Sequence, residues 1–401
     1  MTTYASRIMP TYGRLPVSFS RGAGELLFDG DDRPYIDGVS GIAVTNLGHC
    51  HPAVTKAITA QAGALVHTSN LYRIDTQEAL AATLTDATGM DNVFFCNSGA
   101  EGNETAIKLA RQYGAQKGIE HPGIVVLEAA FHGRTMAALS ATGNEKLQLG
   151  FGPMLEGFYR VARDDIEAIS RLAEAHANIV AVLVEPIQGE GGVYPLPVEY
   201  LKQLRAICDQ HQWLLMFDEV QCGNGRCGSL YAFQRIGVTP DVLVTAKGLG
   251  NGVPIGACMA RGDAAEVMAP GHHGTTYGGN PLACSAAQAV VDTLIGEQLW
   301  DRADPIRAAV LEGFRERLAE PGWVREVRGT GLMIGIELTL PCDGLVQCGL
   351  DQGVLLNVTA GRTVRLLPPL VMSDENARVL GGGVAEAIGA MMARQTQTKG
   401  A

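Results

Sequence analysis

Two neighbouring stretches decide the fold: residues 214–221, Leu-Leu-Met-Phe-Asp-Glu-Val-Gln, and residues 242–252, Val-Leu-Val-Thr-Ala-Lys-Gly-Leu-Gly-Asn-Gly. Each begins with an apolar run of the kind that forms a strand buried on both faces. The first run ends on Asp218, and the second ends shortly before Lys247. Because ligands bind at the carboxyl ends of strands in open α/β sheets, these two charged residues are well placed to form a site.

Similar short apolar runs alternate with helical patterns through the middle of the chain. The further predicted strands are residues 93–95, 124–127, 179–184 and 255–258, and the clearest predicted helices are 101–113 and 198–212. Strands that alternate with helices predict an α/β domain with a mainly parallel sheet.

The pattern changes after about Ala283. A helix is predicted over residues 307–318, strands over 331–338 and 364–367, and a last helix over 374–394. This order is typical of a smaller α+β domain. We therefore expect a large α/β domain over residues 46–283 and a small domain made of residues 1–45 and 284–401.

The composition is that of a globular protein, with 401 residues, 46% hydrophobic and 18% charged. This length suits two domains. The formal net charge of -11 argues against nucleic acid or an anionic membrane as the main partner. It leaves anionic substrates open, because a few well-placed arginines bind those locally.

Nine cysteines are scattered without a Cys-x-x-Cys pair, so neither a disulfide framework nor a zinc ribbon is indicated. Residues 49–51, His-Cys-His, and the pair His272-His273 have no further ligand at a suitable spacing, and we expect no metal site. Residues 1–7 lack the basic and apolar segments of a signal peptide, and the run 179–184 is too short to span a bilayer. A reduced, soluble, cytoplasmic protein is expected.

Lys247 and Asp218 together predict a specific chemistry. Alone, each has an ordinary interpretation, as a loop lysine and as a helix cap. A lysine leaving a buried strand is unusual, however, and a lysine Schiff base to pyridoxal phosphate needs an acidic partner for the pyridine nitrogen. The pair therefore predicts a pyridoxal-phosphate enzyme in which Lys247 also moves the substrate proton.

Two further turns fit this cofactor. Ser98, Gly99 and Ala100 lie between a predicted strand and a predicted helix, where backbone N–H groups bind phosphate. An isolated turn of this kind is more often a plain helix cap. Phe131 and Arg134 follow the strand 124–127, where a ring could stack on the cofactor and a guanidinium could bind a carboxylate. Without that context they would be a core residue and a surface charge.

The chain resembles the class III, or ornithine-type, aminotransferases along nearly its whole length. The matching runs are residues 48–52, 97–101, 131–135, 184–192, 217–221, 246–250, 274–281 and 365–369. Residues 12–16, Tyr-Gly-Arg-Leu-Pro, and 41–44, Gly-Ile-Ala-Val, narrow the resemblance to members that act on acetylornithine. The resemblance implies the type I fold of pyridoxal-phosphate-dependent transferases, with a seven-stranded sheet in the large domain.

The resemblance also implies the residues that bind the cofactor. Lys247 would hold it covalently, Asp218 would bind the pyridinium nitrogen, and Gln221 would bind the ring hydroxyl. The ring would lie between Val220 and Phe131. The phosphate would be bound by Ser98, Gly99 and Ala100, and by Thr276 from the neighbouring subunit, so that the active enzyme is a homodimer.

Substrate binding is implied in the same way. Arg134 would bind a substrate carboxylate, and Thr275 would touch the substrate bound to the neighbouring subunit. Glu190 and Arg365 would form a gate that hides the guanidinium from acetylornithine and exposes it to the α-carboxylate of glutamate. Ile42 stands where ornithine δ-aminotransferases have a tyrosine, which favours an acylated amine.

The expected reaction transfers the terminal amino group of N2-acetyl-L-ornithine to 2-oxoglutarate, giving N-acetyl-L-glutamate 5-semialdehyde and L-glutamate, in arginine biosynthesis. Succinylornithine and succinyl-diaminopimelate are alternative substrates for the same mechanism. An aminomutase has no need of the gate, and a non-catalytic protein would have no need of Lys247 and Asp218. Cys222, Cys227 and Asn251 depart from the usual residues of the family, and we expect local adjustments only.

Overall fold

A computed structural model describes residues 7–399 of the chain, with side chains as far as Gln395. The expectation of no signal peptide concerned residues 1–7 and so lies almost entirely outside the described part. So do the outermost residues of the predicted small domain. Within residues 7–399, no helix is both long enough and apolar enough to cross a membrane.

A seven-stranded sheet forms the centre of the molecule, with β10 (Leu214–Asp218) as its middle strand. Its strand order is β4 (Asn92–Cys96), β12 (Gly256–Ala260), β11 (Val242–Thr245), β10, β7 (Ile179–Val184), β5 (Gly123–Leu127) and β6 (Phe158–Val161). Only β12 runs antiparallel to its neighbours in this sheet, so the predicted mainly parallel seven-stranded sheet is confirmed.

Both faces of this sheet are buried, which is why its strands are apolar throughout. Leu214 and Met216 of β10 belong to one hydrophobic cluster, together with residues of the helix over 99–116. Leu215 and Phe217 point the other way, into a second cluster that contains residues of the helix over 198–211. The strands are therefore apolar at successive positions because helices cover both faces of the sheet.

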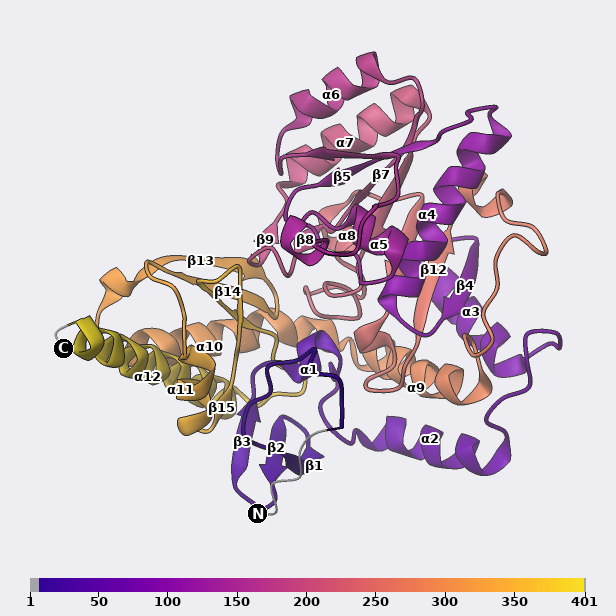
Figure 1. The fold of residues 1–401 in the computed structure, drawn as a ribbon. Coiled ribbons are helices and arrows are strands. Elements are labelled where there is room, and N and C mark those ends of the chain that lie inside the picture. The colour runs from indigo at the N-terminus through magenta and orange to yellow at the C-terminus, as the bar shows by residue number, and fades with distance from the viewer. Residues whose placement is uncertain (1–6, 400–401) are drawn as a thin grey trace.

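The helices around the sheet include the two that the sequence predicts, over residues 101–113 and 198–212 (Figure 1). They are α2 (Pro52–Ala64), α3 (Asp75–Thr88), α4 (Gly99–Gln116), α5 (Met136–Ala141), α6 (Ile166–Ala175), α7 (Val198–His211), α8 (Ala232–Ile236) and α9 (Pro281–Glu297). A two-stranded ribbon, β8 (Ile187–Gln188) with β9 (Tyr194–Pro195), follows β7.

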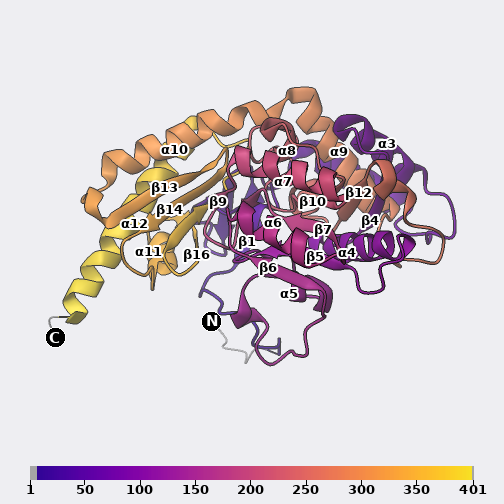
Figure 2. The ribbon, with the colours of Figure 1, turned by 90° about the horizontal axis from the view of Figure 1, so that it is seen from above.

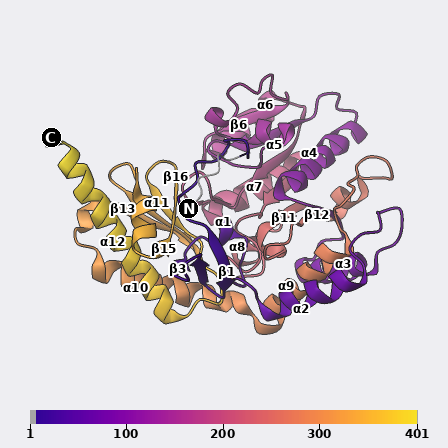
Figure 3. The ribbon, with the colours of Figure 1, turned by 60° about the horizontal axis from the view of Figure 1, so that its bottom comes forward.

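The C-terminal residues form a separate layered region, at the left of Figure 1. Its sheet has the order β13 (Val324–Thr330), β14 (Met333–Leu338), β17 (Thr363–Leu366) and β16 (Asn357–Thr359). Three helices pack with it: α10 (Ala303–Arg317), α11 (Leu345–Asp351) and α12 (Asp374–Lys399). Figure 3 shows α10 and α12 side by side.

The N-terminal segment joins the C-terminal region through a shared sheet. Its strands are β1 (Phe19–Ala23), β2 (Leu26–Asp29) and β3 (Pro34–Asp37), and the fourth strand is β15 (Val354–Leu355). β15 pairs in parallel with β3, so the N-terminal segment shares a sheet with a strand of the C-terminal region. The short α1 (Ser40–Ala43) then leads to the large domain.

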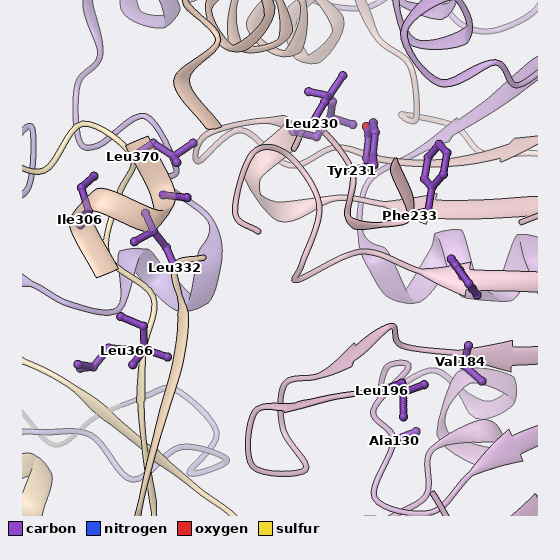
Figure 4. Packing of buried hydrophobic residues seen from close by; sticks show 14 of the residues in the cluster. Ala130, Val184, Leu196, Leu230, Tyr231, Phe233, Ile306, Leu332, Leu366 and Leu370 are labelled. Atoms are coloured by element: carbon purple, nitrogen blue, oxygen red, sulfur yellow. The ribbon is translucent and has the colours of Figure 1, made fainter. Parts of the chain in front are cut away.

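The connection between the two regions is made by consecutive helices. α9 packs against α2 and α3, whereas α10 packs against α12 (Figure 2). Buried side chains form one continuous cluster across both regions, and Figure 4 shows part of it, with Val184 and Phe233 on one side and Leu332 and Leu366 on the other. The precise boundary near residue 283 remains a prediction.

Several strands were not predicted. The edge strand β6 reads Phe-Tyr-Arg-Val and is only partly buried before Val161, so it lacks the apolar run that marked the central strands. The three N-terminal strands are also mostly exposed or half-buried, apart from part of β3. Partial burial over four or five residues leaves neither a continuous apolar run nor a clear alternation in the sequence.

Candidate active site

A cavity of about 450 Å³ lies at the carboxyl ends of the central strands. The segments that follow β4, β5, β10 and β11 converge on it, as the topology of a parallel sheet requires. The predicted residues that line it are Ser98, Gly99, Ala100, Phe131, Arg134, Asp218, Val220, Gln221 and Lys247.

Asp218 ends β10 and is 4% exposed. Its Oδ2 accepts hydrogen bonds from His132 Nδ1 at 2.8 Å and from Asn103 Nδ2 at 2.7 Å, while its Oδ1 accepts one from the backbone of Val220 at 3.0 Å. The carboxylate therefore has a fixed orientation at the edge of the cavity. Neither His132 Nε2 nor Asn103 Oδ1 has a partner among the described residues.

A second buried carboxyl group lies behind Asp218. Glu185 accepts hydrogen bonds from the backbone N–H groups of Phe131 at 2.8 Å and Gly189 at 3.1 Å. Burial, and then the charge of Asp218, raise the pKa of Glu185. Glu185 therefore fixes the turn that carries Phe131.

Lys247 begins the short 3₁₀ turn η2 (Lys247–Leu249) and has a left-handed backbone with φ +48°. No described residue forms a hydrogen bond or ion pair with its amine. Burial lowers the pKa of Lys247, although the charges of Glu190 and Asp218 act in the other direction. A lysine with no partner in a closed site is a strong candidate for covalent or proton-transfer chemistry.

The backbone of Lys247 is held by a buried network of amides. Asn224 Nδ2 donates to Thr245 Oγ1 at 2.9 Å and to the carbonyl of Ala246 at 3.1 Å. The carbonyl of Asn224 in turn accepts from Asn46 Nδ2 at 2.8 Å. These bonds hold the peptide just before the lysine in an otherwise unfavourable turn.

The network continues to the C-terminal region through Arg226, a fully buried arginine that donates to Asn46 and to the carbonyl of Pro368. Asn251, one of the departures from the family, bonds the backbone of Leu47 through Oδ1 at 2.9 Å. The loop that carries Lys247 is thus tied to the N-terminal segment by side chains that lie far apart in the sequence.

Ser98 caps α4, and its Oγ accepts from the backbone of Glu101. The carboxylate of Glu101 in turn accepts from the backbone of Asn97 at 2.8 Å and from Ser98 Oγ at 3.0 Å. A Cβ on Gly99 would lie 2.7 Å from Val220, so the backbone turns in close beside the cavity. The backbone N–H groups of Gly99 and Ala100, at the positive end of the helix dipole, remain available to an anion.

Arg365 lies on β17 and is 1% exposed, yet its guanidinium reaches the active-site region. Its Nη1 forms an ion pair with Glu190 at 2.5 Å, and Asn357 Oδ1 accepts from its Nη2 at 2.7 Å. Gln221 Oε1 also lies 3.3 Å from Nη1. The structure therefore brings together the two residues that were predicted to form a gate.

Arg134 is exposed at the mouth of the cavity, with its guanidinium carbon 5.7 Å from the centre of the Phe131 ring. It has no ion pair with any described residue. An unpaired guanidinium at this place suits a carboxylate ligand.

Besides Glu190 and Arg365, three predicted residues do not line this cavity. Thr275 Oγ1 is 3.4 Å from Asn97 Nδ2, and Thr276 is exposed, so whether either residue serves a neighbouring subunit remains a prediction. Ile42 is about one-third exposed and does not line the cavity, whereas Val44 does. The significance of Ile42 for the substrate also remains a prediction.

Some lining residues were not recognised in the sequence. Asn103 and His132 contact Asp218, and residues 252–255 close the cavity after the lysine loop. His132 lay inside a quoted run, and Asn103 lies one helical turn after the phosphate-binding turn, but neither position has a signal of its own. Only the tertiary contact with Asp218 identifies them.

The arrangement suits a phosphate-bearing aldehyde cofactor with a basic ring. It offers an amine without a partner, a buried carboxylate and a helix N-terminus with a close backbone turn around one cavity. These groups can form an imine, hold a protonated ring nitrogen and bind a phosphate.

The model of the class III aminotransferase family matches residues 8–388. The chain therefore belongs to the class III aminotransferases, a family that depends on pyridoxal phosphate.

Individual relatives are similar over almost their whole length. The acetylornithine aminotransferase of Nitrosomonas europaea is 54% identical over 372 residues, which are 93% of this chain and 95% of the relative. The crystal structure of the acetylornithine aminotransferase of Elizabethkingia anophelis has a TM-score of 0.85 and 35% identity, with 95% and 96% of the two chains covered. The ornithine aminotransferase of Toxoplasma gondii has a TM-score of 0.92 and 34% identity, with 97% and 94% covered.

Proposed function

We propose that the protein transfers the terminal amino group of N2-acetyl-L-ornithine to 2-oxoglutarate, giving N-acetyl-L-glutamate 5-semialdehyde and L-glutamate, as a step of arginine biosynthesis. The observation that carries the proposal is the Glu190–Arg365 ion pair beside a cavity that contains an unpaired lysine. Similarity to curated acetylornithine aminotransferases supports the choice of substrate.

Pyridoxal 5'-phosphate fits the cavity. Asp218 would bind the ring nitrogen, Phe131 and Val220 would enclose the ring, and Gln221 would bond its hydroxyl. Ser98, Gly99 and Ala100 would hold the phosphate. When bound, the cofactor supplies an aldehyde that carries the amino group between substrates and a protonated ring that withdraws electrons.

Lys247 holds the cofactor between turnovers and moves protons during them. Because burial lowers the pKa of Lys247, a larger fraction of its amine is neutral at a given pH than in a lysine in water. The neutral amine can accept the proton from the substrate carbon that bears the reacting nitrogen. The left-handed turn and the Asn224 hydrogen bonds fix the start of the side chain. Because the start of the side chain is fixed, Nζ would lie close to the reacting carbon in each catalytic cycle.

Acetylornithine reacts through an uncharged methylene next to its terminal amine. Its carboxylate, at the far end of the substrate, would bind Arg134 at the mouth of the cavity. The closed Glu190–Arg365 pair leaves no free cation near the reacting end, where an unpaired guanidinium would be poorly solvated.

Glutamate reacts at a carbon that carries a carboxylate, so it needs a cation there. Arg365 is buried and held by Asn357, whereas the side chain of Glu190 is 36% exposed. Glu190 is therefore the residue that moves, turning towards solvent and releasing Arg365 for the α-carboxylate. The side-chain carboxylate of glutamate would then bind Arg134.

We further propose that the active enzyme is a homodimer in the cytoplasm. Thr276 of each subunit would reach the phosphate bound to its neighbour, and Thr275 would reach the substrate there. The exposure of Thr276, outside the cavity of its own chain, supports this arrangement.

A direct test compares kcat/KM for N-acetylornithine, N-succinylornithine and ornithine, each with saturating 2-oxoglutarate. We expect acetylornithine to be the best of the three, with glutamate and the semialdehyde formed in equal amounts. If acetylornithine were the poorest substrate, the proposed substrate would be wrong, while the class of reaction would still stand.

A further inference from the structure

A second cavity, of about 630 Å³, adjoins the first one on its outer side. The two cavities share Phe131 and Arg134 and no other lining residue. One wall of the outer cavity is formed by residues 143–147, which include the short turn η1 (Glu145–Leu147), and another by residues 358–360 of the C-terminal region. A ligand that passes from Lys247 to Arg134 therefore continues into this space.

The proposed substrate requires such a space. If the terminal amine is at Lys247 and the carboxylate is at Arg134, the N-acyl group on the same carbon as the carboxylate must lie next to Arg134. The outer cavity is the space that Arg134 lines on the side away from Lys247. This step rests on the proposed function.

The charges of the outer cavity distinguish an acylated amine from a free one. Its charged lining residues are Arg134, Lys146, Glu145 and Glu190. The charge of Glu190 is balanced by Arg365, and the remaining three have no ion pair within the part of the chain that the structure describes. Two cations therefore face one anion.

We propose that Lys146 is a specificity-determining residue that selects substrates with an N-acyl group and rejects those with a free α-ammonium. The acylated end of the substrate has one negative charge, which complements the net positive lining. The corresponding end of ornithine carries both a carboxylate and an ammonium, so it has no net charge and would place its ammonium near the Lys146 cation. An acyl carbonyl oxygen, by contrast, accepts a hydrogen bond from that ammonium.

The kinetic test uses charge changes at adjacent positions. Lys146→Gln should lower the ratio of kcat/KM for acetylornithine over ornithine several-fold, and Lys146→Glu should lower it by about tenfold. Glu145→Gln should raise the ratio, because it removes the lining anion. Lys202→Glu, on α7 and outside both cavities, is the matched control and should leave it unchanged.

A binding test works without turnover. L-norvaline and N-acetyl-L-norvaline have the carbon chain of ornithine but lack the terminal amine. The holoenzyme is first reduced with borohydride, so that the α-amine of norvaline cannot displace Lys247 from the cofactor. Each compound is titrated calorimetrically into this holoenzyme. The Lys146→Glu variant should bind N-acetylnorvaline more weakly, and norvaline more tightly, than the wild type does. Added salt should reduce both differences, since the cavity is open to solvent.

The outcomes separate the two proposals. If the wild type does not transaminate acetylornithine, the proposed function fails, yet the norvaline pair still reports on the charge of the outer cavity. If both the kinetic and the binding ratios are the same in the wild type, Lys146→Gln and Lys146→Glu, the role of Lys146 is overturned. An equal change in Lys202→Glu would also overturn it, by showing a general effect of net charge.

Discussion

The protein has two cavities of nearly equal volume at opposite ends of its central sheet, and their charges are arranged in opposite ways. At the amino ends of the strands, a cleft of about 470 Å³ contains Asp241, which is paired with Arg205 at 2.7 Å and Arg261 at 3.6 Å. At the carboxyl ends, a cavity of about 450 Å³ contains Asp218, which is held by His132 and Asn103, and Lys247, which has no partner among the described residues.

The difference teaches that volume does not identify an active site here, whereas unsatisfied chemistry does. Arg205 and Arg261 both pair with Asp241, so these charges are balanced within the protein, as in a structural ion-pair network. The amine of Lys247, by contrast, has no partner among the described residues and lines the cavity, where a ligand can bind it.

The strongest way to break this comparison is to remove one residue from each end. Lys247→Ala should lower the rates of both half-reactions by at least about 10³-fold, since both the covalent attachment and the proton transfer are lost. Arg205→Ala should leave kcat unchanged and lower the melting temperature. Single-turnover spectra and thermal unfolding measure the two effects, and a loss of turnover in Arg205→Ala would contradict the division.

The two aspartates offer the next comparison. Asp218→Ala should slow both half-reactions by about 10²–10³-fold, because a preorganised charge beside the ring nitrogen is lost. It should also increase loss of pyridoxal phosphate during dialysis. Asp241→Ala should affect stability alone. Cofactor content and kcat are measured on the same samples of both variants. An equal effect of Asp218→Ala and Asp241→Ala on these two quantities would contradict the comparison.

Arg365 sharpens the comparison within the active-site end. Arg365→Ala should reduce kcat/KM for glutamate by about 10²-fold, since a buried partner of the α-carboxylate is removed. The acetylornithine half-reaction should change by a few-fold at most. Arg365→Lys keeps the charge and should lie between the two. Equal damage to both half-reactions would show that Glu190 and Arg365 do not act as a gate.

The support beneath the lysine should have a smaller effect. Asn224→Ala removes the donor to the carbonyl of Ala246, and kcat should fall by about tenfold with little change in KM, because Lys247 is less well positioned. Asn178→Ala, which removes hydrogen bonds far from the cavity, is the control. A change in KM alone for Asn224→Ala would contradict a positioning role.

The pH dependence of Lys247 gives the finest comparison. Burial lowers its pKa, so at a given pH a larger fraction of Lys247 is neutral than of an exposed lysine such as Lys202. The neutral amine is the form that attacks an aldehyde. In the cofactor-free protein, reductive methylation with formaldehyde should therefore favour Lys247 over Lys202 near neutral pH, and the ratio should fall towards pH ~10.4. A ratio that rises with pH, read by peptide mass spectrometry, would contradict the lowered pKa.

Much of the fold and half of the site follow from local sequence. The strands 179–184 and 214–217 are apolar on every position because helices cover both faces, and such runs are easily recognised. Asp218 and Lys247 stand out because charged residues rarely follow such strands directly. β6 and the N-terminal strands were missed because partial burial leaves no comparable pattern.

By itself, the sequence determined the strand-and-helix order, the positions of Lys247 and Asp218 at strand ends, and the resemblance that carried the remaining roles. Tertiary structure alone decided that Asn103 and His132 hold Asp218, and that Lys146 lines a cavity together with Arg134. The physical reason is the separation along the chain of the residues that contact one another. Burial and strand ends are visible in the identities of neighbouring residues. The hydrogen bonds that hold Asp218 join residues 86 and 115 positions apart, so they form only after the sheet has brought those residues together.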